Sequence, residues 1–238
     1  MTALIVAAGQ GTRLRDKGPC KPLIPILGTP LIERVIASAR RAGIKNFTVV
    51  SGYRGEELRE ALDSFSIRES ISIEHVINED WERSNGVSVY KAQGFVSDPF
   101  ILTMCDHLVD PTILQDLLAL PLLPDTVTLG VDTNIENPLN DPDDVTRVKC
   151  VDGKIHRIGK ILKDYNAIDT GVFLCTSIIF KALETSFSEG DESISGAINV
   201  LARWEKAFVY PIENRVWVDI DDPAAFSKTE QLIKTGKL

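Results

Sequence analysis

The sequence predicts one α/β domain in which helices flank a mixed β-sheet. Three observations lead to this prediction. Short apolar runs alternate with amphipathic helical stretches over the first half of the chain. From residue 126 onward, strand-like runs follow one another instead. No repeat, low-complexity tract or Pro/Ser-rich linker divides the 238 residues, so we expect a single domain over 1–238, with parts at 1–125 and 126–238.

The expected elements of the first half alternate between strand and helix. The apolar run from Leu4 to Ala8 stops at Gly9, as a strand buried on both faces of a parallel sheet does. The next helix has apolar residues at helical spacing, Pro30 near its first turn and Gly43 as its stop. We predict strands at 4–8, 47–50, 71–77 and 99–104, and helices at 30–42, 55–65, 87–93 and 111–120. Because helices connect these strands, the strands should lie parallel in a Rossmann-like sheet.

The second half predicts an antiparallel addition to that sheet. Strand-like runs follow one another at 127–131, 145–151, 155–158 and 167–175, with a turn at Asp152-Gly153. Further strands are expected at 207–211 and 216–220, and helices at 177–187, 193–202 and 223–233.

Charge and cysteine content disfavour several classes of function. The net charge is −8, so the surface as a whole repels nucleic acid and anionic lipid, and an anion site needs a local group of cations. The cysteines form no CxxC pair and have no histidine at metal-ligand spacing, which predicts reduced thiols without disulfides or zinc. No run of eighteen apolar residues occurs, and the N-terminal run lacks a basic leader region. We expect a cytoplasmic protein with no membrane insertion.

A glycine loop with several cations follows the first strand. It contains Gly9 and Gly11, and Arg13 and Lys21 come soon after. A dinucleotide-binding fingerprint needs glycine where Leu14 stands, and the Gly-Lys-Ser/Thr of a Walker A loop is absent. A plain surface turn is the other alternative, since glycine permits positive φ. The place of the loop at the end of a parallel strand favours a phosphate site built from backbone N–H groups and the two cations.

The same stretch resembles the signature of the sugar-nucleotide nucleotidyltransferases. The resemblance rests on Leu4-Ile5-Val6-Ala7-Ala8-Gly9-Gln10-Gly11-Thr12-Arg13-Leu14, on Lys21-Pro22-Leu23 and on a helix that begins near Pro30-Leu31-Ile32. The family has proline directly before the lysine, where this chain has Cys20. The resemblance implies a nucleotide-diphospho-sugar transferase fold. It also implies nucleotide binding by Ala7, Ala8, Gly9, Gln10, Gly11, Thr12, Arg13 and Lys21.

Nucleotidyl transfer normally uses Mg²⁺ to stabilise charge on the phosphates, and Mg²⁺ prefers carboxylate ligands. Asp106 and Asp219 each end an apolar strand-like run and resemble the two metal-binding aspartates of the family. Asp221 shares a face with Asp219 by the two-residue period and is the weaker choice. Most aspartates cap helices or form turns, and Asp110 and Asp222, each before proline, fit caps. We expect Asp106 and Asp219 to hold Mg²⁺.

The resemblance to the family implies that the base of the nucleotide lies against residues 78–88, between a strand and a helix. The Asn-Gly-x-Ser ending of this segment resembles the cytidylyltransferases of the family more than the Gly-Thr-rich loops of uridylyl or thymidylyl enzymes. A polar loop with a capping residue is an equally good structural explanation. The resemblance implies CTP binding through Asn78, Asn85, Gly86, Ser88 and Asp106.

The acceptor site is expected in the second half. A lysine at a strand end, Lys160, can hold a phosphate, and Asp169 beside glycine can accept hydrogen bonds from two neighbouring hydroxyls. This pair suits a polyol phosphate. A choline acceptor would need an aromatic cage, for which the chain offers Trp81, Tyr90, Tyr165 and Trp217. His107 is interpreted as a positioning residue, and the expected acceptor-binding residues are His107, Lys160, Asp169, Thr170 and Gly171.

Taken together, residues 100–107, 158–160, 168–171 and 217–221 resemble most the members of the family that act on inositol 1-phosphate. The resemblance implies transfer of CMP from CTP to inositol 1-phosphate, with Arg13, Lys21, Asp106 and Lys160 as catalytic residues. Phosphocholine and a sugar 1-phosphate are the alternative acceptors. A catalytically silent nucleotide-binding module and an NAD-dependent oxidoreductase are the alternatives from other classes.

Some members of the family are fused to a membrane phosphatidyltransferase-like enzyme. This chain shows no such segment, so we expect a free-standing enzyme that passes CDP-inositol to a separate partner. The sequence predicts no particular oligomeric state.

Overall fold

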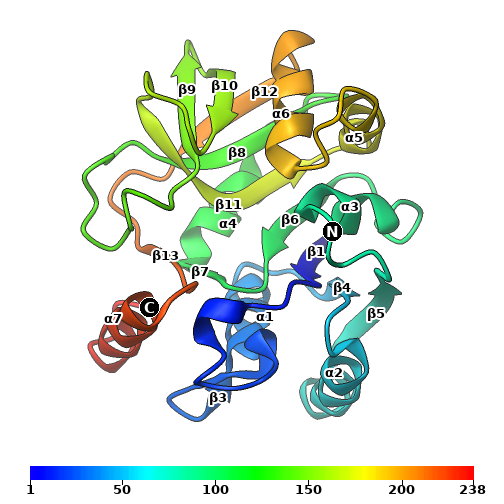
Figure 1. Ribbon diagram of the computed structural model, residues 1–238, viewed down its shortest axis with the longest axis vertical. Helices are drawn as coiled ribbons and strands as arrows, with labels where there is room; N and C mark the ends of the chain where they lie inside the picture. The colour runs from blue at the N-terminus through cyan, green and yellow to red at the C-terminus, as the bar shows by residue number, and fades with distance from the viewer.

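Nine strands form one mixed sheet in the computed structural model, which describes residues 1–238 (Figure 1). The strand order is β5-β4-β1-β6-β11-β8-β12-β10-β9. In the first half, β1 pairs in parallel with β4 and β6, and β4 pairs in parallel with β5. The bounds are β1 (Thr2–Ala7), β4 (Asn46–Ser51), β5 (Ser72–Ile77) and β6 (Phe100–Met104). The expected parallel strands are confirmed.

Strand β11 joins the two parts of the sheet, because it pairs antiparallel with β6 on one side and with β8 on the other. The remaining strands are β8 (Val127–Asp132), β9 (Arg147–Val151), β10 (Lys154–Gly159), β11 (Ala167–Cys175) and β12 (Ala207–Pro211). Strands β9 and β10 form the hairpin expected at Asp152-Gly153. Strand β12 lies parallel to β8, a pairing that the sequence pattern does not specify.

Strand β13 (Trp217–Asp219) lies outside the main sheet. It pairs antiparallel with β7 (His107–Val109), a strand that the sequence does not predict, and Asp219 lies opposite His107. The strand expected at 216–220 is thus present, but its partner comes from the first half of the chain. A second short ribbon joins β2 (Pro25–Ile26) to β3 (Thr29–Pro30).

Helices cover both faces of the main sheet. Side chains of α1 (Leu31–Arg41), α2 (Gly55–Glu69) and α4 (Pro111–Ala119) belong to one hydrophobic cluster. Side chains of α3 (Asn85–Lys91), α5 (Ile178–Ser188) and α6 (Ile194–Arg203) belong to another. Because side chains alternate along a strand, β1 supplies Leu4 and Val6 to the second cluster and Ile5 to the first. The sheet is therefore buried on both faces, as its apolar strands predict.

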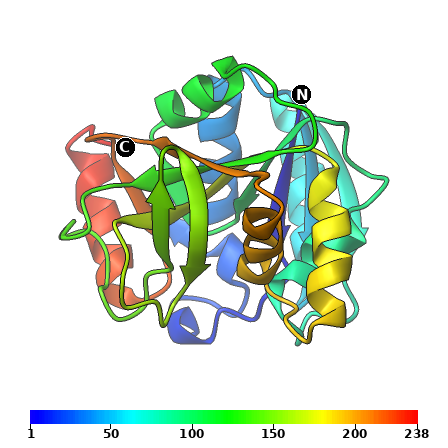
Figure 2. The same ribbon diagram turned by 90° about the horizontal axis from the view of Figure 1, so that it is seen from above.

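Helix α7 (Pro223–Lys234) packs away from these two layers, on a smaller cluster that contains Leu14 and Val218. Figure 2 shows α7, in red, on the opposite side of the molecule from α5, in yellow. The side chain of Asp222 accepts hydrogen bonds from the first backbone N–H groups of α7, and Asp110 does the same for α4. Both aspartates are caps, as predicted. No helix is both long and apolar enough to cross a membrane.

Candidate active site

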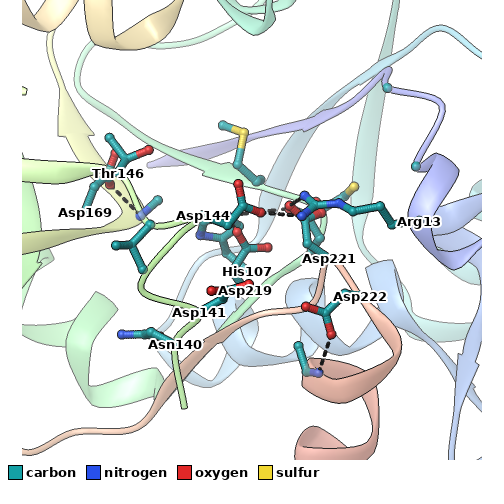
Figure 3. Close-up of a pocket in the computed structure, with 18 of the residues that line it drawn as sticks. Arg13, His107, Asn140, Asp141, Asp144, Thr146, Asp169, Asp219, Asp221 and Asp222 are labelled. Carbon is teal, nitrogen blue, oxygen red and sulfur yellow. Dashed lines mark hydrogen bonds and ion pairs between the residues drawn. The ribbon is translucent and has the colours of Figure 1, made fainter. Parts of the chain in front are cut away.

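A cavity of about 710 Å³ opens at the carboxyl ends of β1 and β6 (Figure 3). Open parallel sheets bind their ligands at this edge. The wall combines the glycine loop after β1, the turn after β6, the end of β13 and the loop between β8 and β9. The predicted site residues that line it are Ala7, Gly9, Gly11, Thr12, Arg13, Lys21, Asn85, Asp106, His107, Lys160, Asp169, Gly171, Asp219 and Asp221.

The glycine loop brings Lys21 into the cavity wall. Gly11 has a φ of +60°, and a Cβ atom there would lie 2.5 Å from Cβ of Lys21. Glycine is therefore required by the left-handed backbone and also by the close approach of the lysine. The chain forms short 3₁₀ turns at Thr12–Leu14 and Lys21–Leu23, and the second turn fixes the backbone of the lysine.

Two carboxylates surround the buried ammonium group of Lys21. Nζ lies 2.5 Å from Oδ2 of Asp106 and also pairs with Asp221, and the lysine side chain is only 6% exposed. Burial by itself lowers the pKa of Lys21, but Asp106 and Asp221 together hold it above its ordinary value. The lysine is therefore charged at neutral pH and stands between two acidic groups of the cavity.

Ion pairs continue from this point across the cavity. Arg13 pairs with Asp221 and with Asp144, as Figure 3 shows, and Nζ of Lys160 lies 2.5 Å from Oδ1 of Asp144. Burial opposes the ionisation of Asp144, but hydrogen bonds from Lys160 and Arg13 keep its pKa below the ordinary value. Asp144 thus links the cation of the glycine loop to the lysine expected at the acceptor.

Asp106, His107 and Asp219 meet at one point of the cavity, where their ligand atoms lie within 4.8 Å of one another. Nε2 of His107 lies 3.7 Å from Oδ1 of Asp106 and 3.5 Å from Oδ2 of Asp219. Asp106 follows β6, and Asp219 arrives through the β7–β13 ribbon. The structure therefore brings together the two aspartates that the sequence singles out.

His107 is held in place by its neighbours. Nδ1 donates a hydrogen bond to the backbone oxygen of Thr170, 2.8 Å away. Burial alone lowers the pKa of His107, but the charges of Asp219 and Asp106 raise it to about 10. Because Nδ1 is already bonded to Thr170, only Nε2 of the ring faces the two carboxylates.

The carboxylate pair fits a hard divalent cation. Oδ1 of Asp219 is buried and has no hydrogen-bond partner, and a cation would satisfy such an acceptor. Asp221 fits less well, because its two oxygens already pair with Lys21 and Arg13. Asp106 and Asp219 are therefore the side chains best placed to hold a metal ion.

The segment expected to hold the base reaches the cavity through one side chain. Asn85 lines the cavity, and its Oδ1 accepts a hydrogen bond from a backbone N–H of α6, 3.0 Å away. Asn78 and Ser88 are buried and bonded to each other, with Nδ2 2.9 Å from Oγ. A Cβ atom on Gly86 would lie 2.3 Å from the carbonyl oxygen of Glu192. The cavity wall at Asn85 is thus supported by three residues that do not line the cavity themselves: Asn78, Gly86 and Ser88.

The acceptor residues expected on β11 have distinct environments. Oδ1 of Asp169 accepts a hydrogen bond from the backbone N–H of Gly171 at 2.7 Å, and burial raises the pKa of Asp169 to about 6. Gly171 has a φ of +73°, and a Cβ atom there would lie 2.1 Å from Nδ1 of His107. Thr170 does not line the cavity: its buried hydroxyl donates to the carbonyl of Gly130. Thr170 therefore contributes its backbone oxygen to His107.

Two predicted loop residues do not line the cavity, and several lining residues were not predicted. Ala8 is buried, and its carbonyl oxygen accepts a hydrogen bond from the backbone N–H of Tyr53. Gln10 is not among the residues that line the cavity. Sequence reasoning missed Asn140, Asp141, Asp144, Thr146 and Lys228. None of them ends a strand or belongs to the motifs identified above, so no sequence signal separates them from other polar loop and helix residues.

A family model described as the MobA-like NTP transferase domain matches residues 3–150. The match covers more than half of the chain and includes the glycine loop, Lys21 and Asp106. The chain belongs to this family. The prediction of a nucleotidyltransferase family from the glycine loop is therefore confirmed.

Two curated relatives match nearly the whole chain. The bifunctional IPC transferase and DIPP synthase of Aquifex aeolicus is 30% identical over 99% of this chain and 52% of the relative. The protein of the same name from Thermococcus kodakarensis is 32% identical over 97% of this chain and 50% of the relative. The chain thus spans about half the length of the curated relatives it matches.

Solved structures support the fold. The inositol-1-phosphate CTP transferase from T. maritima superimposes with a TM-score of 0.87 at 28% identity, covering 98% of this chain and 94% of that chain. A UDP-glucose pyrophosphorylase complexed with UDP-glucose gives a TM-score of 0.79 at 18% identity, over 99% and 98% of the two chains, which shows the fold alone. The expected nucleotide-diphospho-sugar transferase fold is confirmed.

Proposed function

We propose that this chain transfers CMP from CTP to inositol 1-phosphate, giving CDP-inositol and pyrophosphate. The observation that carries the proposal is the convergence of Lys21, Asp106 and Asp219 on one cavity that also contains Arg13 and Lys160. The similarity to the inositol-1-phosphate CTP transferase from T. maritima, which extends over nearly both chains, supports the choice of substrates.

The glycine loop and two cations bind the triphosphate in this proposal. Gly9 and Gly11 line the cavity at the end of β1, where a phosphate can approach the backbone N–H groups. Lys21 is fixed by burial, and Arg13 is 48% exposed and can exchange its ion pairs with Asp144 and Asp221 for a phosphate. The charge that develops on the leaving pyrophosphate is stabilised by these groups.

The proposed cofactor is Mg²⁺, held by Asp106 and Asp219. Two carboxylates together with substrate phosphates are a usual environment for this ion. When bound, Mg²⁺ neutralises phosphate charge and polarises the phosphoryl group under attack. His107 lies between the two carboxylates, with Nε2 facing both of them.

Inositol 1-phosphate is proposed to bind between Lys160 and Asp169. Lys160 exchanges its ion pair with Asp144 for the acceptor phosphate, and Asp169 accepts hydrogen bonds from ring hydroxyls. The attacking phosphate oxygen is already anionic, so no general base is required. Lys160 then aligns that oxygen for displacement of pyrophosphate from the α-phosphorus.

The aromatic residues of the chain favour a polyol phosphate over phosphocholine. Of the four considered for a cage, only Trp217 lines the cavity, and it is buried with its ring stacked on His107. Trp81 and Tyr90 pack on other aromatic rings, and Tyr165 packs on a guanidinium group. No cage of several ring faces surrounds the proposed acceptor site.

The proposal also covers where the reaction takes place and what happens to its product. We place the reaction in the cytoplasm and expect CDP-inositol to pass to a membrane phosphatidyltransferase-like enzyme. The curated relatives are named for two activities and are about twice as long as the matched region, which supports a second reaction after the one proposed here.

The test is a matrix of nucleotides against acceptors, scored by release of pyrophosphate. CTP, UTP, dTTP, ATP and GTP are each combined with inositol 1-phosphate, phosphocholine and hexose 1-phosphates in the presence of Mg²⁺. We expect turnover with CTP and inositol 1-phosphate. Turnover only with phosphocholine or a hexose 1-phosphate would replace the acceptor, and nucleotide binding without any pyrophosphate release would indicate a silent binding module.

A further inference from the structure

A buried carboxylate outside the catalytic group connects two parts of the site. Asp132 ends β8 and is only 1% exposed. It accepts three hydrogen bonds: from Nε1 of Trp217 at 2.9 Å, from Nδ2 of Asn137 at 2.8 Å and from the backbone N–H of Asn134 at 2.9 Å. Each donor lies on a segment that contributes to the cavity, so Asp132 ties these segments to the main sheet.

The first connection leads to the metal-binding end of the cavity. Trp217 begins β13 and Asp219 ends it, so the indole ring and the metal-binding carboxylate lie on the same short strand. The indole also stacks on His107, with ring centroids 6.3 Å apart. Because β13 does not belong to the main sheet, the hydrogen bond to Asp132 is a side-chain tether between this strand and β8.

The second connection leads to the loop between β8 and β9. Asn134 and Asn137 hold the start of this loop against Asp132, and Oδ1 of Asn137 accepts a hydrogen bond from the backbone N–H of Leu139. The loop then lines the cavity from residue 139 to residue 146 and carries Asp144, the partner of Lys160. The two connections therefore share one carboxylate, and Oδ2 accepts from both Trp217 and Asn137.

We propose that Asp132 is a positioning residue that couples the metal ligand Asp219 to the loop that faces the acceptor. The part of this inference that concerns the acceptor rests on the proposed function. Groups that orient metal ligands typically change metal affinity or activity by about 10- to 100-fold when they are removed. Asp132 orients Asp219 through its hydrogen bond with the Trp217 indole. It holds the loop between β8 and β9 in position through its hydrogen bond with Asn137.

Three variants separate the two connections. Trp217→Phe removes the Nε1 donor and keeps a ring beside His107. Asn137→Ala removes the hydrogen bond from the loop to Asp132 and leaves the hydrogen bond from the Trp217 indole in place. Asp132→Asn keeps the shape but replaces an acceptor oxygen with a donor, so the three N–H donors can no longer all be satisfied.

The measurements are the Kd for Mn²⁺ by EPR, without substrates, and the KM values for CTP and inositol 1-phosphate. We expect Trp217→Phe to raise the Mn²⁺ Kd about 10-fold with little change in the KM for inositol 1-phosphate. Asn137→Ala should raise that KM about 5- to 10-fold and leave the Mn²⁺ Kd unchanged, a split that a merely structural role would not give. Asp132→Asn should change both constants. Trp204→Phe, at a half-exposed indole on the end of α6, is the matched control.

The outcomes distinguish this inference from the proposed function. The coupling by Asp132 is wrong if Trp217→Phe and Asn137→Ala change the same constant. It is also wrong if Trp217→Phe leaves the Mn²⁺ Kd unchanged and Asn137→Ala leaves the KM for inositol 1-phosphate unchanged. If Asp132→Asn does not fold, as judged by thermal melting, the other two variants still decide. If the wild-type chain turns over no inositol 1-phosphate, the proposed function fails, and the Mn²⁺ Kd of the variants alone decides whether Asp132 positions the metal ligand.

Discussion

The two halves of the chain supply their parts of the cavity in different ways. In the first half, two groups of the cavity come directly after a strand: the glycine loop follows β1, and Asp106 follows β6. In the second half, Asp219 comes from a strand outside the main sheet, and Asp144 comes from a long loop. Local connections therefore fix the first set of groups, whereas long-range contacts fix the second.

The difference shows in the interactions that hold each group. Lys21 is buried against Gly11 and Asp106 and has almost no freedom to move. Lys160 is 60% exposed and is held only by its pairing with Asp144. The proposed nucleotide side of the cavity is thus preorganised, while the proposed acceptor side depends on exposed ion pairs that a substrate can replace.

The largest effect is expected on the preorganised side, from Asp106→Asn. The substitution removes one carboxylate of the proposed metal-binding pair and leaves Lys21 with one partner fewer. We expect kcat to fall by about 10²-fold or more, the scale seen when one preorganised charge contact is lost. Pyrophosphate release at saturating Mg²⁺ measures it, with Asp152→Asn in an exposed turn as the control. Near-normal turnover would show that Asp106 does not hold the metal.

The glycine loop offers the next test. Gly11→Ala places a Cβ atom against Lys21, whereas Gly153→Ala meets no atom within 4 Å at a similar positive φ. The left-handed backbone costs about 1–2 kcal/mol in both variants, and the clash adds about 1–3 kcal/mol at Gly11 only. Denaturant unfolding measures the difference, and we expect the KM for CTP to rise only in Gly11→Ala. Equal stability of the two variants would contradict the close packing of Lys21.

A smaller effect is expected on the acceptor side, from Lys160→Ala. This change removes the proposed charged contact to the acceptor phosphate, worth about 1.5–3 kcal/mol, and part of the loss is offset because the lysine is exposed. We therefore expect the KM for inositol 1-phosphate to rise about 10-fold with the KM for CTP unchanged. Lys163→Ala, three residues further along and exposed, is the control. A rise in the KM for CTP instead would place Lys160 on the nucleotide side.

The smallest effect concerns stability and pH at Asp169. Burial raises the pKa of this carboxyl from 3.8 to about 6. A raised pKa favours the protonated form in the folded state, so the contribution of Asp169 to stability is present below pH 4 and lost as the pH rises through 6. Asp169→Asn should thus raise the free energy of unfolding at pH 8 and leave it nearly unchanged at pH 4, because only the charged carboxylate is disfavoured by burial. Thermal melting at both values checks this, and the KM for inositol 1-phosphate should rise in the same variant.

Both halves of the chain contain elements that local patterns predict and contacts that they do not. The parallel strands and their helices are confirmed because apolar runs and helical periodicity are local properties. Strand β7 and its pairing with β13 were missed, since three-residue strands carry little pattern. Asp144 and Asp132 were missed for a related reason: each acts through residues far away in the chain.

The sequence by itself determined the order of elements, the glycine loop and the aspartates that end apolar runs, because these depend on neighbouring residues. Only the tertiary structure decided which side chains meet. It placed β13 beside β7, set Asp219 against His107, joined Asp144 to Arg13 and Lys160, and buried Asp132 under Trp217. Such contacts are fixed by packing and hydrogen bonds between distant segments, and the pattern of residues along one segment carries no information about its distant partner.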